Sequence, residues 1–208
     1  MSSDIPRYSD REEKFNAATH WCGVLLLLPM VTWIPADVCF PVKAAWGFYF
    51  FTLLFMFCAS ASYHSVKSRK NKALCRKLDH CAIYLLITGT YAPLMVKLFP
   101  DWRGAAVMVT LGVLTATGIT IKLCCDSRIF HRIEVGIFLL MGWLCILLAK
   151  PMIESMPRNG LLLLLCGGLA YSGGVIFYVI KKEFFHAVWH IFVLAGAILQ
   201  LMAVLTLR

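Results

Sequence analysis

The sequence has few charged residues and no extended polar region. Only 15% of its 208 residues are charged, whereas 60% are Ala, Val, Ile, Leu, Met, Phe, Trp, Tyr or Cys, and the mean hydropathy is +0.76. A soluble domain of this size needs more polar residues than this to cover its surface. The composition therefore predicts an integral multi-pass membrane protein with no separate soluble domain.

Four familiar patterns are also missing. The first hydrophobic run follows a charged segment and has no small-residue cleavage site behind it, so we expect no cleavable signal peptide. Among nine cysteines, only Cys39 falls clearly outside in the topology derived below, which argues against a structural disulfide. The segment HAVWH is not an HExxH protease motif, because Ala187 replaces the glutamate. The runs also show no continuous charged stripe that would line a pore.

Seven hydrophobic runs dominate what is present. A bilayer core about 30 Å thick needs about 20 apolar residues per helix. The runs that meet or approach this length are 15–34, 44–66, 78–96, 104–121, 133–149, 159–180 and 184–207. We therefore predict an all-α fold, a bundle of seven transmembrane helices forming one domain at 15–208. A polar cytosolic segment at 1–14 precedes it.

Basic residues are distributed unevenly between the two sides. The N-terminal segment and the segments after the second, fourth and sixth runs carry 14 of the 20 Lys and Arg residues. The positive-inside rule therefore predicts a cytosolic N-terminus and an outside C-terminus. The basic segment 65–77 contains no acidic residue, and we interpret it as a topology determinant that contacts anionic lipid. Membrane lipids, and no nucleic acid, are the expected partners.

Histidines and one aspartate meet at the predicted inner boundary. His186 and His190 are spaced i and i+4, which puts both rings on one helix face. In the predicted topology, His64 ends the second run and Asp79 opens the third at the same depth. Three imidazoles with an open position beside a carboxylate are typical of a catalytic zinc site. We predict that the three histidines bind Zn²⁺, that Asp79 deprotonates bound water, and that Ser60 contributes a hydroxyl.

Simpler explanations exist for each of these residue types. A histidine at a helix end often contacts water or a backbone carbonyl, and we prefer this interpretation for His20, His80 and His131. Each of them is expected to bond a neighbouring helix or to face solvent. Asp79 could instead pair with a basic residue of the preceding turn. Ser60 could be a small residue that lets two helices approach closely.

Five motifs, in order, resemble those of hemolysin III proteins. These proteins belong to the progestin and adipoQ receptor family, which is related to the alkaline ceramidases. The resemblance covers almost the full chain. The motifs are EEKFNAATH at 12–20, SASYH at 60–64, LDHCAIYLLITGTYAP at 78–93, GGLAYSGGVIFY at 167–178 and HAVWHIFVLAGA at 186–197.

The resemblance implies a seven-helix fold with the N-terminus inside and a zinc ion bound by the three histidines named above. It also implies that Asp79 interacts with the zinc-bound water and that Ser60 lies close by. Glu13, Asn16 and His20 become part of a family motif, although the residues themselves indicate no role. One departure is a glutamine, at position 200, where many hemolysin III sequences carry histidine.

These observations predict a zinc-dependent membrane hydrolase of lipid amides, similar to a ceramidase, whose lipid substrate arrives from the bilayer. Two alternatives stay open. The first is a membrane receptor or regulator in which zinc is structural. The second is a channel-forming hemolysin, which the missing pore stripe disfavours. The expected location is the cell membrane in a bacterium, or the plasma membrane or endomembranes in a eukaryote.

Overall fold

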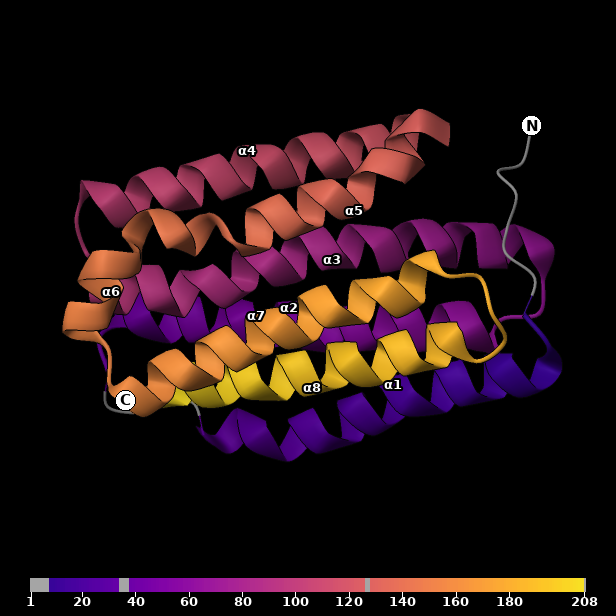
Figure 1. The fold of residues 1–208 in the computed structure, drawn as a ribbon, viewed down its shortest axis with the longest axis horizontal. Helices are drawn as coiled ribbons and strands as arrows, with labels where there is room; N and C mark the ends of the chain where they lie inside the picture. Colours follow the sequence, from indigo (N-terminus) through magenta and orange to yellow (C-terminus); the bar gives the residue numbers. More distant parts are fainter. Residues whose placement is uncertain (1–7, 34–37, 126–127, 208) are drawn as a thin grey trace.

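The computed structural model describes residues 8–33, 38–125 and 128–207, apart from the side chains at 128, 131 and 132. Within these residues the chain is helical and contains no strand. Seven helical segments are long and apolar enough to cross a membrane, which confirms the predicted seven-helix class. Figure 1 shows the long helices side by side along one axis of the molecule.

The helices follow the predicted runs with shifted ends. They are α1 (Asp10–Met30), α2 (Phe40–Ser65), α3 (Arg69–Leu98), α4 (Trp102–Cys124), α5 (Arg128–Gly142), α6 (Ala149–Ser155), α7 (Arg158–Val179) and α8 (Phe185–Leu205), with 3-10 turns at Val31–Trp33 and Leu144–Leu148.

The first helix begins inside the segment predicted to be polar and separate. Ser9 caps α1: its hydroxyl accepts from the Glu12 backbone N–H, and the Glu12 carboxylate accepts from the Ser9 N–H. This capping box satisfies two N–H groups that a helix start leaves without partners. Residues 10–14 therefore form the first turns of α1. Residues 1–7 lie outside the described residues.

The third helix also begins earlier than its hydrophobic run. The predicted basic segment 65–77 is mostly helical, because α3 starts at Arg69 and only residues 66–68 connect it to α2. Lys and Arg are good helix formers, so the charged sequence continues the helix beyond its apolar part. The basic residues then lie along the first turns of α3.

The fifth membrane segment is broken in the middle. The segment 133–155 passes from α5 through the 3-10 turn at Leu144–Leu148 into α6. The hydroxyl of Tyr91, on α3, accepts from the Cys145 backbone N–H at 2.8 Å and lies 2.8 Å from the Gly142 carbonyl oxygen. Tyr91 thus satisfies backbone groups that the break exposes, as a membrane interior requires.

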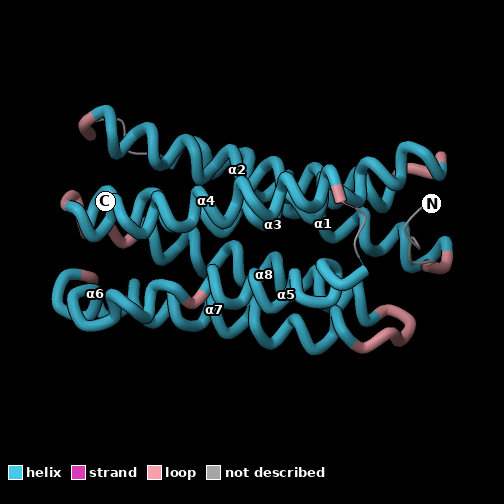
Figure 2. The backbone as a smooth tube through the Cα atoms, turned by 90° about the horizontal axis from the view of Figure 1, so that it is seen from above, coloured by secondary structure: helices cyan, strands magenta, loops and turns pink. Residues whose placement is uncertain are grey.

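The bundle consists of two groups of helices. α2 packs closely against both α1 and α3, α4 packs on α3, and α7 packs along α8, whereas α5 and α7 touch only sparsely. Figures 1 and 2 place α2 and α7 on opposite sides of the bundle. α1 joins the groups because it contacts both α2 and α8. A weakly packed seam therefore runs between α5 and α7.

Only some of the helix glycines lie in close contacts between helices. A Cβ at Gly112, Gly136 or Gly142 would meet no described atom within 4 Å. By contrast, a Cβ at Gly118 of α4 would lie 2.4 Å from the Tyr84 ring, and one at Gly89 of α3 would lie 2.1 Å from Thr52 Oγ1. Close approaches of this kind thus occur where α3 meets α2 and α4.

Gly118→Ala and Gly112→Ala form a matched pair in α4. Both substitutions raise helix propensity by about 1 kcal/mol. Only the first also drives a methyl group into the Tyr84 ring, and such overpacking costs about 1–3 kcal/mol. We expect Gly118→Ala to melt at a lower temperature than the wild type in detergent, followed by circular dichroism, and Gly112→Ala to melt at the same or a higher temperature. Equal melting temperatures for the two variants would contradict this packing.

The predicted orientation can be tested with two cysteines at opposite ends of the bundle. Cys39 precedes α2, and Cys125 follows α4 at the end where Lys77 donates to the Leu123 carbonyl. Both cysteines are exposed, and all nine cysteines of the chain are free thiols. In single-cysteine variants in intact cells, a membrane-impermeant maleimide is expected to label Cys39 and to reach Cys125 only after permeabilisation. The reverse pattern would overturn a cytosolic N-terminus.

Candidate metal centre

Three histidines predicted as ligands meet at one end of the bundle. His64 lies on the last turn of α2, and His186 and His190 lie on the first turns of α8. One nitrogen of each ring lies within 4.8 Å of the other two. His64 and His190 are buried, and His186 is partly buried. Folding thus joins residues more than 100 positions apart, as the predicted topology requires.

The spacing of the rings fits a single bound metal ion. Two nitrogens bound at 2.0–2.1 Å in tetrahedral geometry lie about 3.3 Å apart. The Nε2 atoms of His186 and His190 are 3.1 Å apart, close to that value. The Nε2 atom of His64 is buried without a hydrogen-bond partner, so the cluster supplies a buried nitrogen that needs a ligand. Imidazole groups of this kind suit several divalent metals.

A carboxylate on α1 fixes the orientation of the His64 ring. Nδ1 of His64 donates to Glu13 Oε2 at 2.7 Å, and the ammonium of Lys72 binds the other Glu13 oxygen. A metal-binding histidine commonly donates its second N–H to a carboxylate, which fixes the tautomer and makes the other nitrogen a better ligand. Glu13 therefore leaves the lone pair of His64 Nε2 for the cluster.

The same face of α1 supports His190. Nδ1 of His190 lies 3.2 Å from the Asn16 carbonyl oxygen and 3.3 Å from Thr19 Oγ1. Asn16 Nδ2 also lies 3.5 Å from His64 Nδ1. The His20 ring stacks on the His190 ring, with centroids 3.9 Å apart. The family motif of α1, to which the sequence assigned no role, thus forms a polar face behind His64 and His190.

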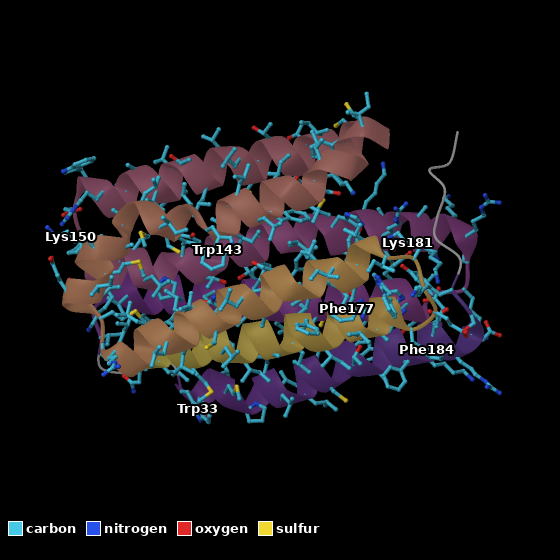
Figure 3. The ribbon with its side chains drawn as sticks, viewed as in Figure 1. Trp33, Trp143, Lys150, Phe177, Lys181 and Phe184 are labelled. Carbon is cyan, nitrogen blue, oxygen red and sulfur yellow. The ribbon has the colours of Figure 1, made fainter. Side chains whose placement is uncertain are left out.

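Glu12, next to Glu13, fixes the start of α8. Its Oε1 accepts from the Phe184 backbone N–H at 2.6 Å. Phe184 adopts a left-handed conformation with φ of 62°, which is costly by about 1–2 kcal/mol for a residue with a side chain. Figure 3 shows Phe184 and Lys181 at the end of the bundle opposite Lys150. Adjacent glutamates therefore position His64 and the beginning of the helix that carries His186.

Tyr8, which the sequence interpretation did not identify, covers the cluster. Its ring stacks on that of His186, with centroids 4.9 Å apart. Burial raises the pKa of the Tyr8 hydroxyl above its ordinary value, and the nearby Tyr63 adds to the effect. Tyr8 therefore stays protonated at neutral pH and can donate a hydrogen bond. Burial also lowers the pKa of Lys181, and the nearby Arg76 is a second cause.

A cavity of about 510 Å³ adjoins the cluster. Ser60 and Asp79 border it, together with His186 and His190. Ser60 is buried and Asp79 is partly buried. Both predicted catalytic side chains thus border the cavity that adjoins the histidine cluster.

Beyond its polar end, the cavity is mostly apolar. Its wall includes Leu86 and Leu94 of α3, Phe138 of α5, and Val193 of α8. Figure 3 shows Trp143 near the middle of the bundle's length, and Trp143 also borders the cavity. The cavity thus extends from the histidine cluster deep into the membrane-spanning bundle.

The remaining histidines and Gln200 have different surroundings. His80 bonds a neighbouring helix, as expected, through Glu134 of α5. The hydrogen bond expected for His20 is not formed: both ring nitrogens are buried without a partner, because the ring packs against His190 and Phe57. The side chain of His131 lies outside the described residues. Gln200 donates to the Leu164 carbonyl and borders the cavity.

Comparison with known proteins agrees with the motifs. Residues 8–201 match the family described as Haemolysin-III related. The Hemolysin-3 homolog of Bacillus subtilis (strain 168) is 36% identical and the match covers 95% of each chain. Hemolysin-3 of Bacillus cereus is 35% identical, with 94% of this chain and 91% of that protein covered.

A human protein is similar over almost the same length. Monocyte to macrophage differentiation factor of Homo sapiens is 31% identical, with 91% of this chain and 82% of that protein covered. No solved structure matches the chain. The family match and the similarity to full-length relatives confirm the resemblance predicted from the motifs. The chain is an integral multi-pass membrane protein and belongs to the haemolysin-III-related family.

Proposed function

We propose that the protein is a zinc-dependent hydrolase of lipid amides. The observation that carries the proposal is the three-histidine cluster beside a cavity that Asp79 and Ser60 also border. A metal site of three histidines leaves one position for water or substrate, which is the arrangement of catalytic rather than structural zinc. The cluster, the carboxylate and the hydroxyl are the parts that amide hydrolysis requires.

His64, His186 and His190 would hold the ion, which when bound lowers the pKa of water and polarises a carbonyl. Asp79, which borders the same cavity, would accept a proton from the attacking water. Ser60 can donate to the oxygen of the scissile carbonyl, where negative charge develops. Tyr8 borders the same cavity and is protonated at neutral pH, so its hydroxyl can be a second donor to that oxygen.

The shape of the cavity supports a lipid substrate. Asp79 and Leu94 of α3 both border it, and 15 residues of helix span about 22 Å. A long acyl chain can therefore lie along α3 with its amide beside Asp79. The sparse contact between α5 and α7 offers a path from the bilayer. Trp143 Nε1 donates to Ser172 Oγ of α7 at 2.9 Å across this seam.

Metal analysis of the purified protein tests the site. We expect about one zinc ion per wild-type chain, and loss of that ion in His64→Ala, His186→Ala and His190→Ala. Glu13→Gln should keep the ion but bind it about 10–100-fold more weakly in a chelator competition, because it removes the carboxylate behind His64. His80→Asn and Glu183→Gln are matched controls outside the cluster. Zinc retained in all three alanine variants would contradict the proposed site.

Hydrolysis of a ceramide in mixed micelles tests the reaction. The wild type is expected to release free fatty acid. Asp79→Asn should lower the rate by about a hundredfold or more, because it removes the proton acceptor while leaving the histidines in place. Asp101→Asn removes a carboxylate just before α4 and should have no effect. If the wild type binds zinc but releases no more fatty acid than Asp79→Asn, the receptor alternative with structural zinc is favoured.

A further inference from the structure

A second buried polar cluster lies on α3, α4 and α5, away from the three histidines. Lys122 Nζ is 2.7 Å from Glu134 Oε2 and 2.8 Å from His80 Nδ1, and His80 Nδ1 is 2.8 Å from the same Glu134 oxygen. Lys122 and Glu134 are only 3% and 1% exposed. Buried charges in a membrane protein are costly and commonly mark proton or ion pathways.

The cluster meets the cavity through one residue. His80 borders the cavity, whereas Lys122 and Glu134 are not among the residues of its wall. Asp79, the neighbour of His80 on α3, borders the same cavity. The imidazole of His80 therefore stands between the cavity and a buried ammonium–carboxylate pair.

The three contacts cannot all be hydrogen bonds in one arrangement of protons. When Nδ1 of His80 carries no proton, it accepts from the Lys122 ammonium, and the ring proton sits on Nε2. When Nδ1 carries the proton, it donates to Glu134, and Nε2 becomes an acceptor. Both contacts of Nδ1 are present at 2.8 Å. Lys122 and Glu134 can therefore stabilise either tautomer of His80 in turn, and the ring does not have to move.

We propose that His80 protonates the leaving amine during amide hydrolysis, with Lys122 as its proton source and Glu134 as the acceptor that holds the second tautomer. This inference rests on the proposed function. Breaking the C–N bond leaves its electron pair on nitrogen, which takes the proton from His80 Nε2. Lys122 transfers a proton to Nδ1, which then donates to Glu134. Before the next turnover, Nδ1 returns its proton to Lys122 while Nε2 takes a proton from water in the cavity, and Asp79 releases the proton it took from the attacking water.

Other ionisable groups surround the relay and set its charge balance. Among the described residues, the groups that interact electrostatically with the cluster include Arg76, Cys81 and Tyr84 on α3, Tyr178 on α7 and His186 on α8, besides the neighbouring Asp79. The test therefore compares two substrates at one pH, so that these groups affect both alike.

Two substrates with the same acyl chain separate proton donation from structure. N-palmitoyl sphingosine must release an amine that needs a proton, whereas p-nitrophenyl palmitate releases a phenolate that does not. We expect His80→Asn and Lys122→Met to lower amide turnover by about a hundredfold or more and to leave ester turnover within a few-fold of wild type. Thr115→Val is the matched control, because it breaks a buried 2.7 Å contact to Thr88 between the same two helices, outside the cavity.

An equal loss of turnover on both substrates would overturn the relay. The cluster would then have only a structural role. The double variant Lys122→Met/Glu134→Gln removes both buried charges together, so it keeps the test decisive if a single variant does not fold. Zinc content should be unchanged in every variant.

A spectroscopic measurement separates failure of the relay from failure of the proposed function. If the wild type hydrolyses neither compound, the hydrolase proposal fails, and ¹⁵N NMR of histidine-labelled protein still reports on His80. We expect its ring proton on Nε2 in the wild type and in Glu134→Gln, and on Nδ1 in Lys122→Met. His80→Asn assigns the signal. The same tautomer in the wild type and in Lys122→Met would overturn the coupling between these residues.

Discussion

The need to satisfy polar groups away from water governs this structure. An imidazole buried in a helix bundle is costly unless its nitrogens have partners. In the histidine cluster, α1 provides most of them: Glu13 accepts from His64, and Asn16 lies against His190. α1 is the least hydrophobic of the seven membrane-spanning segments because its inner face carries these partners. The helix that contributes none of the three histidines thus determines how two of their rings point.

Buried polar contacts also explain how the bundle can be both ordered and open. α1, α2 and α8 are tied by the histidine cluster and by Glu12, whereas α3, α4 and α5 are tied by Lys122 and Glu134. Between α5 and α7 the contacts are sparse, and the cavity borders helices of both groups. The polar contacts thus lie on either side of the sparsely packed seam, through which the proposed lipid substrate would enter.

Hydrophobic runs and charge distribution were enough to predict seven helices and to place His64 and Asp79 at the end where α8 begins. Helix spacing alone paired His186 with His190. The roles of Glu13 and Asn16 required the structure, because they depend on how α1 is rotated against α2 and α8. The ion pair between Lys122 and Glu134 could not be predicted from the sequence either, because the two residues lie on different helices and share no motif. Sequence periodicity fixes which face of a helix is polar, and only packing shows what that face meets.

Adjacent positions on α3 give the two polar clusters a common support. Successive residues of an α-helix point about 100° apart, so Asp79 and His80 both reach the cavity wall while His80 also turns toward α4 and α5. Rotating α3 would displace both residues together. A buried ion pair contributes little net stability compared with well-packed apolar residues, so stability alone does not account for Lys122 and Glu134. The contacts of Lys122 and Glu134 with His80 hold α3 in one rotation against α4 and α5, and that rotation directs both Asp79 and His80 to the cavity wall.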